Sequence, residues 1–212
     1  MSRLRVINLG LPKTGTTTLN KALRRVGLKV ADWRIRGRQT TNEAIIGKHV
    51  GRLIYRSYFD TGDPLAALEE FDAVTEMSYV TFKFSAWPQT DWALLSALRL
   101  HHPGARFLLS VRDPLKTARS MKKWNNLGEK RLPDSSIPGL PRGFGHTEAE
   151  LVRWIEGHYT FCRHAFDKSD VFLEYDVEDT DAPKKIGAFL GLDLPWWGHI
   201  NQNPDNKRED AQ

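Results

Sequence analysis

The chain has 212 residues, 40% of them hydrophobic, which is enough apolar material for one substantial core in a single domain over 1–212. Its one cysteine, Cys162, excludes an internal disulfide and a cysteine-based metal cluster. The formal net charge of +5 does not by itself indicate a nucleic-acid partner, because the basic residues are dispersed and form no recognisable DNA- or RNA-binding motif.

The first half of the chain predicts strands and helices in alternation. A short β-branched run predicts a buried strand over 4–9, and helical spacing follows over 16–26. The pattern then predicts a strand at 28–30, helices at 41–56 and 64–71, a strand at 73–75, a helix at 91–101, a strand at 106–111 and a helix at 114–125. Such alternation is typical of a three-layer α/β/α fold with a central parallel sheet.

The second half begins with a long stretch rich in proline and glycine. Residues 126–147 are predicted to lack regular structure, and loops of that length are usually functional or disordered. We expect a lid over a binding site here, with disorder as the alternative. A capping box at Thr147 and Glu150 then begins a helix. After it the pattern predicts the end of this helix near residue 167, a strand at 171–175 and a last helix from Asp181 to Gly191.

The chain shows no sign of membrane targeting. Met1, Ser2 and Arg3 lead straight into the first predicted strand without a signal peptide, and no apolar stretch is long enough to cross a bilayer. We therefore expect a cytoplasmic protein with no membrane span.

The turn between the first strand and the first helix has the features of a phosphate site. Residues 10–19 read GLPKTGTTTL. Glycines let backbone N–H groups turn inward at a helix N-terminus, where the helix dipole also favours an anion. Lys13 adds a cationic side chain, and the threonines at 14, 16, 17 and 18 add hydroxyl donors.

This turn differs from the P-loop of ATP and GTP hydrolases. Those enzymes place a lysine directly after the second glycine, where this chain has Thr16. The only lysine of the turn, Lys13, stands two residues before Gly15 and would reach the bound group from the other side of the loop. No acidic residue at a strand end is an obvious magnesium partner.

A second cationic motif follows the strand at 106–111. Arg112 leaves the end of this strand, Pro114 suits the first turn of a helix, and Ser120 lies eight residues after Arg112. Arginine suits phosphate because its planar fork binds two oxygens of one group. The alternative is an Arg-Asp pair at a helix start with Ser120 merely exposed.

Together the two motifs resemble those of the sulfotransferases that use 3′-phosphoadenosine-5′-phosphosulfate (PAPS). The resemblance covers residues 4–26 and 103–124 and implies a P-loop-like fold. It implies that the glycine turn holds the 5′-phosphosulfate and that Arg112 and Ser120 hold the 3′-phosphate. The implied cofactor-binding residues are Pro12, Lys13, Thr14, Gly15, Thr16, Thr17, Thr18, Arg112 and Ser120.

Members of this family commonly close the cofactor site with a late basic loop that contains glycine. The nearest counterpart here is a segment near 201–210, which carries Lys207 and Arg208 but no glycine. These two residues are the expected further ligands of the 3′-phosphate, and a solvated tail is the alternative.

The resemblance implies sulfuryl transfer to a hydroxyl or amine, and this chemistry needs a cation and a base. Lys13 is positioned to stabilise the departing phosphate oxygen, so no metal is required. Asp32 follows the second predicted strand and is our first choice for the base, and the alternative is a salt bridge to Arg34 or Arg36. The other candidate bases are Asp60, Glu76, Asp91 and His146.

The acceptor is not identified by the sequence. A small molecule, a glycan or a lipid is compatible with the resemblance, and residues 126–147 are the expected acceptor loop. Among the tryptophans, Trp87 and Trp124 are the first candidates for stacking on a bound ring. A P-loop-type small-molecule kinase and a non-catalytic nucleotide-binding module remain the alternatives.

Overall fold

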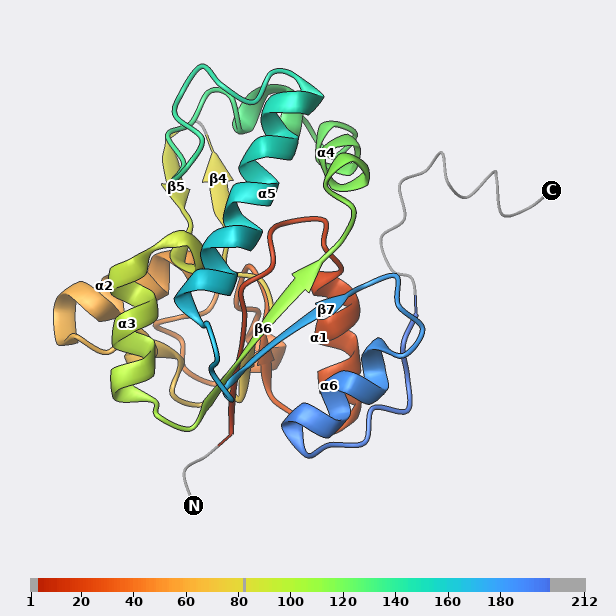
Figure 1. The fold of residues 1–212 in the computed structure, drawn as a ribbon. Coiled ribbons are helices and arrows are strands. Elements are labelled where there is room, and N and C mark those ends of the chain that lie inside the picture. The colour runs from red at the N-terminus through yellow and green to blue at the C-terminus, as the bar shows by residue number, and fades with distance from the viewer. Residues whose placement is uncertain (1–3, 82, 199–212) are drawn as a thin grey trace.

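A five-stranded parallel sheet forms the centre of the computed structural model, which describes residues 4–81 and 83–198 (Figure 1). The order of the strands across the sheet is β2-β3-β1-β6-β7, and every neighbouring pair is parallel. Their bounds are Arg5–Asn8 for β1, Val30–Ala31 for β2, Ala73–Val74 for β3, Ala105–Val111 for β6 and Phe172–Asp176 for β7.

In the described part of the chain, α-helices cover this sheet on both sides, and α4 packs against α5 beyond the end of β6 (Figure 1). Figure 1 shows α1 and α6 together on one side, and α2, α3 and α5 on the other. Their bounds are Thr16–Arg25 for α1, Val50–Thr61 for α2, Trp92–His101 for α3, Pro114–Lys122 for α4, Glu148–Ala165 for α5 and Ala182–Leu190 for α6. Within residues 4–81 and 83–198, no helix combines the length and the apolar character that a bilayer crossing requires.

The side chains of the central strands alternate between two apolar cores. Val6 and Leu108 point to the core that α1 and α6 cover, whereas Ile7 and Phe107 point to the larger core under α2, α3 and α5. All four are at most 2% exposed, so both faces of the sheet are buried. The three-layer α/β fold expected from the sequence is thereby confirmed.

The strand order places a topological switch point beside β1. From β1 the chain crosses to β2 and returns through β3 on one side, and it then continues through β6 and β7 on the other side. Ligands of open parallel sheets bind outside the carboxyl ends of the strands at such a point. The segments that follow β1 and β6 are the glycine turn and Arg112, so both predicted motifs lie at this edge of the sheet.

Several predicted elements between β1 and α3 were wrong in extent. The helix expected at 41–56 begins only at Val50 and continues to Thr61, because residues 42–48 form turns that pair with the chain after β2. The helix expected at 64–71 is a single 3₁₀ turn at Ala66–Leu68. An antiparallel hairpin, with β4 at Tyr79–Thr81 and β5 at Phe84–Ala86, was not predicted.

Residues 126–147 are packed against the body of the protein. Leu132, Ile137 and Leu140 are buried in the larger core, and the Trp154 indole donates a hydrogen bond to the Pro138 carbonyl at 3.0 Å. The expectation of no regular structure was wrong for Leu127–Arg131, which form a π-helical turn. The apolar residues between the prolines and glycines explain why the segment packs.

Gly10 is required by the close approach of β1 to β6. A Cβ atom at this position would lie 1.8 Å from the Ser110 Oγ and 2.7 Å from the Thr14 Oγ1. We expect Gly10→Ala to lower the free energy of unfolding by about 2 kcal/mol through overpacking. Urea denaturation would measure it, with Gly157→Ala as the control.

The control glycine lies in α5 with open space around it, so alanine there should leave stability unchanged or raise it by about 1 kcal/mol. Equal stability of the two variants would contradict the crowding that we describe at Gly10.

Candidate active site

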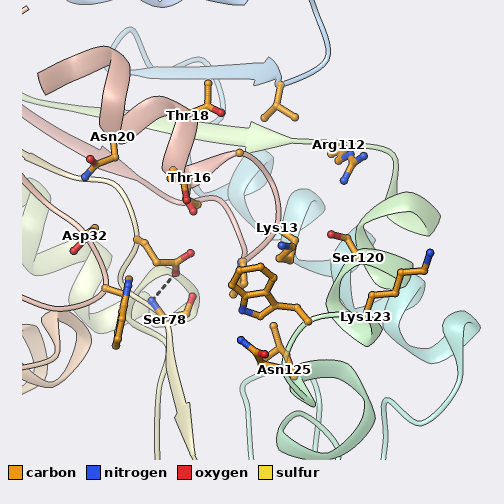
Figure 2. A pocket seen from close by; sticks show the side chains of 18 of the residues that line it. Lys13, Thr16, Thr18, Asn20, Asp32, Ser78, Arg112, Ser120, Lys123 and Asn125 are labelled. Carbon is orange, nitrogen blue, oxygen red and sulfur yellow. Dashed lines mark hydrogen bonds between the residues drawn. The ribbon is translucent and has the colours of Figure 1, made fainter. Parts of the chain in front are cut away.

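A large pocket opens at the carboxyl ends of the central strands (Figure 2). Its volume is about 1160 Å³, which exceeds the usual size of a pocket for one drug-sized ligand, about 300–1,000 Å³. The glycine turn, Arg112 and Ser120 all line it, although they come from segments that are about a hundred residues apart. The two sequence motifs therefore share one cavity.

The backbone of the glycine turn presents the start of α1 to this pocket. Lys13 and Gly15 both adopt left-handed conformations, with φ of 73° and 81°. Gly15 packs so close to Val177 that a Cβ atom would lie 2.8 Å from a Val177 methyl group. The first turn of α1 contains no acidic residue, so its N–H groups and dipole are available to an anion.

The threonines of the turn divide between the pocket and the core. Thr16, Thr17 and Thr18 line the pocket, and the Thr18 hydroxyl donates to the Gly198 carbonyl at 2.8 Å. Thr14 departs from the expectation because its hydroxyl is fully buried beneath the loop. It donates to the Leu11 carbonyl at 2.7 Å, and thus stabilises the turn from within instead of lining the cavity.

Lys13 lies in the middle of the pocket wall, beside an aromatic ring. Its Nζ is 3.8 Å from the centre of the Trp124 ring, close enough for a cation–π contact. Burial and the nearby charge of Arg112 lower the pKa of Lys13 to about 8. An ammonium with such a pKa remains mostly protonated at neutral pH and gives up its proton more readily than an exposed lysine.

Arg112 and Ser120 lie together on the other side of Lys13 from Asp32 and Ser78 (Figure 2). The backbone of Arg112 is fixed by the Tyr159 hydroxyl, which is 3.2 Å from both its nitrogen and its carbonyl oxygen. Ser120 is 8% exposed, in α4. The sequence anticipated both residues here.

Glu178 is a pocket residue that the sequence analysis missed. Its carboxylate accepts hydrogen bonds from Arg112 Nε at 2.9 Å and from Lys116 Nζ at 2.8 Å. The bond from Lys116, together with the neighbouring Arg112, lowers the pKa of Glu178 below its usual value. No local pattern points to this residue, because the contact joins the end of β7 to the end of β6.

Asp32 lines the pocket but is engaged in an ion pair. Arg36 Nη1 donates to both of its carboxylate oxygens, at 2.8 and 2.6 Å, so the salt bridge that the sequence left open is present. A proton taken up by Asp32 would have to break this pair. Its role as a base therefore stays a hypothesis.

Glu76 is the second carboxylate on this side of the pocket. It follows β3, and its Oε1 accepts the Ser78 N–H at 3.0 Å, drawn as the dashed line beside Ser78 in Figure 2. Burial raises the pKa of Glu76 to about 7, against the opposing effect of hydrogen bonds from Ser78 and Thr16. A carboxylate with this pKa is suited to accept a proton near neutral pH.

The other three candidate bases do not line the pocket. Asp60 pairs with Arg56 on the exposed face of α2, and Asp91 caps the start of α3. His146 precedes the capping box of α5. Glu76 and Asp32 are thus the expected bases that the fold brings to the cavity.

The pocket lining carries more positive than negative charge. Three acidic residues line it, namely Asp32, Glu76 and Glu178, against seven basic ones, which are Lys13, Arg36, Arg112, Lys116, Arg119, Lys123 and Arg131. Such a surplus attracts a highly charged anion. The described residues include no cluster of three His, Cys, Asp or Glu side chains that suits a metal ion.

The two tryptophans singled out from the sequence have different positions. Trp124 lines the pocket, where it contacts Lys13. Trp87 is 1% exposed and packs edge-on against Trp154 in the larger core. Only Trp124 of this pair is therefore placed to contact a bound ring.

His158 supports the glycine turn from below, and the sequence analysis did not single it out. Its Nε2 donates to the Leu9 carbonyl at 2.7 Å, which ties α5 to the end of β1. Burial lowers the pKa of His158 to about 4, so the imidazole is neutral at physiological pH. A buried neutral histidine is compatible with the apolar surroundings of Cys162, whose Sγ is 3.6 Å away.

The last described residues also reach the pocket. Trp197 and Gly198 line it, and the Trp197 indole donates to the Val177 carbonyl at 3.5 Å. Lys207 and Arg208, the expected late ligands, lie outside the described residues.

Comparison with known proteins identifies a family and similar solved structures. The family model described as "Sulfotransferase domain" matches residues 5–207. No curated protein matches the sequence. Among solved structures, a mouse sulfotransferase, SULT7A1, complexed with PAP is similar, with 16% sequence identity and a TM-score of 0.45. The match covers 100% of this chain and 63% of the mouse chain, so this chain spans less than two thirds of that length.

Proposed function

Because the chain belongs to the sulfotransferase domain family, we propose that it transfers the sulfuryl group of PAPS, in line, to a hydroxyl or amine of an acceptor. The observation that carries this proposal is the shared cavity. The glycine turn, which carries Lys13, lies with Arg112 and Ser120 at the carboxyl ends of neighbouring parallel strands, and all of them line one pocket. A ligand with phosphates at two ends fits this arrangement.

Two groups of residues are proposed to hold the cofactor. The N-terminus of α1, with Thr16 and Thr17, binds the 5′-phosphosulfate, since backbone N–H groups and hydroxyls converge there. Arg112 and Ser120 bind the 3′-phosphate. Their fit to PAPS is supported by the surplus of basic residues along the pocket.

Lys13 is proposed to act on the leaving group. PAPS, when bound, supplies the sulfuryl group, and its leaving group is adenosine 3′,5′-bisphosphate, which departs through the 5′-phosphate oxygen. The Lys13 ammonium stabilises the negative charge that grows on the bridging phosphate oxygen, or donates its proton there. The lowered pKa of Lys13, about 8, suits a proton donor.

Glu76 is proposed as the general base, in preference to Asp32. It accepts the proton of the acceptor hydroxyl or amine as the acceptor atom attacks sulfur. Two observations support this choice: its pKa is raised to about 7, and no arginine among residues 4–81 and 83–198 forms a salt bridge with it as Arg36 does with Asp32. Asp32 with Arg36 then contributes to the wall that receives the acceptor.

The acceptor side of the pocket combines aromatic and basic surfaces. Trp33 and Tyr79 line it, together with Arg131 of the π-helical turn. Because Leu127 and Arg131 both face the cavity, we propose that residues 126–147 form the acceptor loop. This lining suits a small molecule, a glycan or a lipid headgroup with a ring that can stack.

Arg112→Ala is expected to weaken cofactor binding more than it slows turnover. The loss of a charge-assisted contact to phosphate should raise the KM for PAPS by about 30-fold, while kcat changes little. Initial rates at varied PAPS measure this split. Arg163→Ala is the matched control, because Arg163 pairs with Glu174 and does not line the pocket. An unchanged KM with a lowered kcat would contradict the assigned role.

The function itself is tested by ligand stabilisation and by product analysis. We expect adenosine 3′,5′-bisphosphate to raise the Tm more than ATP with magnesium does, since a ligand of the native state stabilises it. Mass spectrometry of a mixed acceptor set incubated with PAPS should then reveal a product heavier by one sulfuryl group. A preference for ATP would favour a kinase, and bisphosphate binding without any product would favour a binding module.

A further inference from the structure

Glu178 occupies the part of the pocket where the proposed function places the 3′-phosphate. Its two carboxylate oxygens are both engaged, Oε1 by Arg112 Nε at 2.9 Å and Oε2 by Lys116 Nζ at 2.8 Å. These cations come from two elements, since Arg112 follows β6 and Lys116 lies in α4. In this arrangement an anion of the protein itself bridges cations that line the pocket.

The backbone of Glu178 is fixed, but its side chain is free to move. The Val177 N–H donates to the Val111 carbonyl at 3.0 Å, and the Glu178 N–H donates to Asp176 Oδ1 at 2.8 Å. The Glu178 side chain is 35% exposed, so it can leave the two cations without disturbing the core. The Lys116 side chain is 58% exposed and can follow a different anion.

We propose that Glu178 is a built-in competitor of the 3′-phosphate: its carboxylate holds Arg112 and Lys116 in the free protein and gives them up when the 3′-phosphate of the cofactor binds. This inference rests on the proposed function. A phosphate monoester carries about −1.5 to −2 charges and three acceptor oxygens, whereas the carboxylate carries one charge and two oxygens. The phosphate therefore displaces the carboxylate.

A nucleotide without a 3′-phosphate gains nothing at this end of the pocket. ATP and adenosine 5′-phosphate present a ribose hydroxyl there, which cannot compete with a carboxylate for two cations. Glu178 thus lowers the affinity for 3′-phosphorylated nucleotides, whose phosphate must displace its carboxylate, and leaves the affinity for other nucleotides unchanged. The alternative, that Glu178 only orients Arg112 for phosphate, predicts an affinity change of the opposite sign.

The test measures nucleotide binding to the full chain and to Glu178→Gln by isothermal titration calorimetry. We expect the variant to bind adenosine 3′,5′-bisphosphate about ten times more tightly, because the competing carboxylate is gone. Binding of adenosine 5′-phosphate should change by less than about twofold. Glu178→Ala, which also removes the carboxylate, should behave in the same way.

Glu174→Gln is the matched control, because it makes the same chemical change on β7 and also removes a carboxylate paired with an arginine. Glu174 and its partner Arg163 do not line the large pocket, so neither affinity should change. Weaker or unchanged bisphosphate binding in both Glu178 variants, or equal tightening of the two nucleotides, would overturn the inference alone. Failure of every protein to bind the bisphosphate would overturn the proposed function as well.

Discussion

Lys13→Ala is expected to lower kcat by about 10²–10³-fold, because it removes the cation proposed to stabilise charge on the leaving phosphate. Binding of adenosine 3′,5′-bisphosphate should weaken much less, since Arg112 and the α1 N-terminus remain in place. Alanine meets the same left-handed backbone, with φ of 73°, that lysine already occupies, so the variant should fold. Single-turnover rates with saturating PAPS and an acceptor measure the effect.

Two further variants separate charge from proton donation at position 13. Lys13→Arg keeps a cation that does not lose its proton in the accessible pH range. Partial activity with no decline at high pH indicates that the charge suffices, whereas activity as low as that of Lys13→Ala indicates a proton donor. Lys185→Ala removes an exposed lysine outside the pocket and should leave kcat unchanged. A wild-type rate in Lys13→Ala would remove this residue from the mechanism.

Glu76→Gln is expected to lower kcat/KM by about 10²–10⁴-fold, the usual contribution of a general base. Glutamine keeps the size of the side chain and its acceptor oxygen for the Ser78 N–H, so the loop after β3 should retain its shape. Asp32→Asn is the matched comparison, since it makes the same change in the same pocket. A large loss in Asp32→Asn with little loss in Glu76→Gln would reverse the assignment of the base.

The pH dependence of kcat/KM gives a second test of the proposed roles of Glu76 and Lys13. Glu76 must be deprotonated to act as a base, so activity is lost as the pH falls through its pKa of about 7. Lys13 must be protonated, so activity is lost as the pH rises through its pKa of about 8. We expect kcat/KM to follow a narrow bell between these values. Glu76→Gln should abolish the decline in kcat/KM at low pH. A decline at low pH that persists in this variant would contradict the role of Glu76 as the base.

The cofactor motifs were the most predictable part of the site. The glycine turn needs residues that are adjacent in the chain, and Arg112 and Ser120 are joined by one short strand-to-helix segment. Their meeting in one pocket follows from the parallel pairing of β1 with β6. The alternation of strands and helices predicted a parallel sheet, but not which strands are neighbours. Among the expected cofactor residues that the structure describes, Thr14 alone does not line the pocket, because the sequence does not show which hydroxyls of a turn face inward.

The candidate bases and Glu178 were much less predictable. In the sequence, Glu76 is one of several candidate carboxylates. The position of β3 beside β1 is what brings it to the pocket. The ion pair of Asp32 with Arg36 depends on the turn after β2, and the hairpin β4 and β5 that follows Glu76 was not predicted at all. These features depend on loops whose course is set by contacts with distant segments.

The sequence by itself determined the layered parallel fold, the glycine turn and the cationic residue after β6, because these depend on local periodicity, glycine and residue type. Only the tertiary structure decided that Glu76 lies half-buried in the pocket beside the turn, and that Glu178 binds Arg112 and Lys116. The physical reason is that burial and ion pairing are set by which strand ends become neighbours. That order arises from the packing of the whole sheet, which no short stretch of the chain encodes.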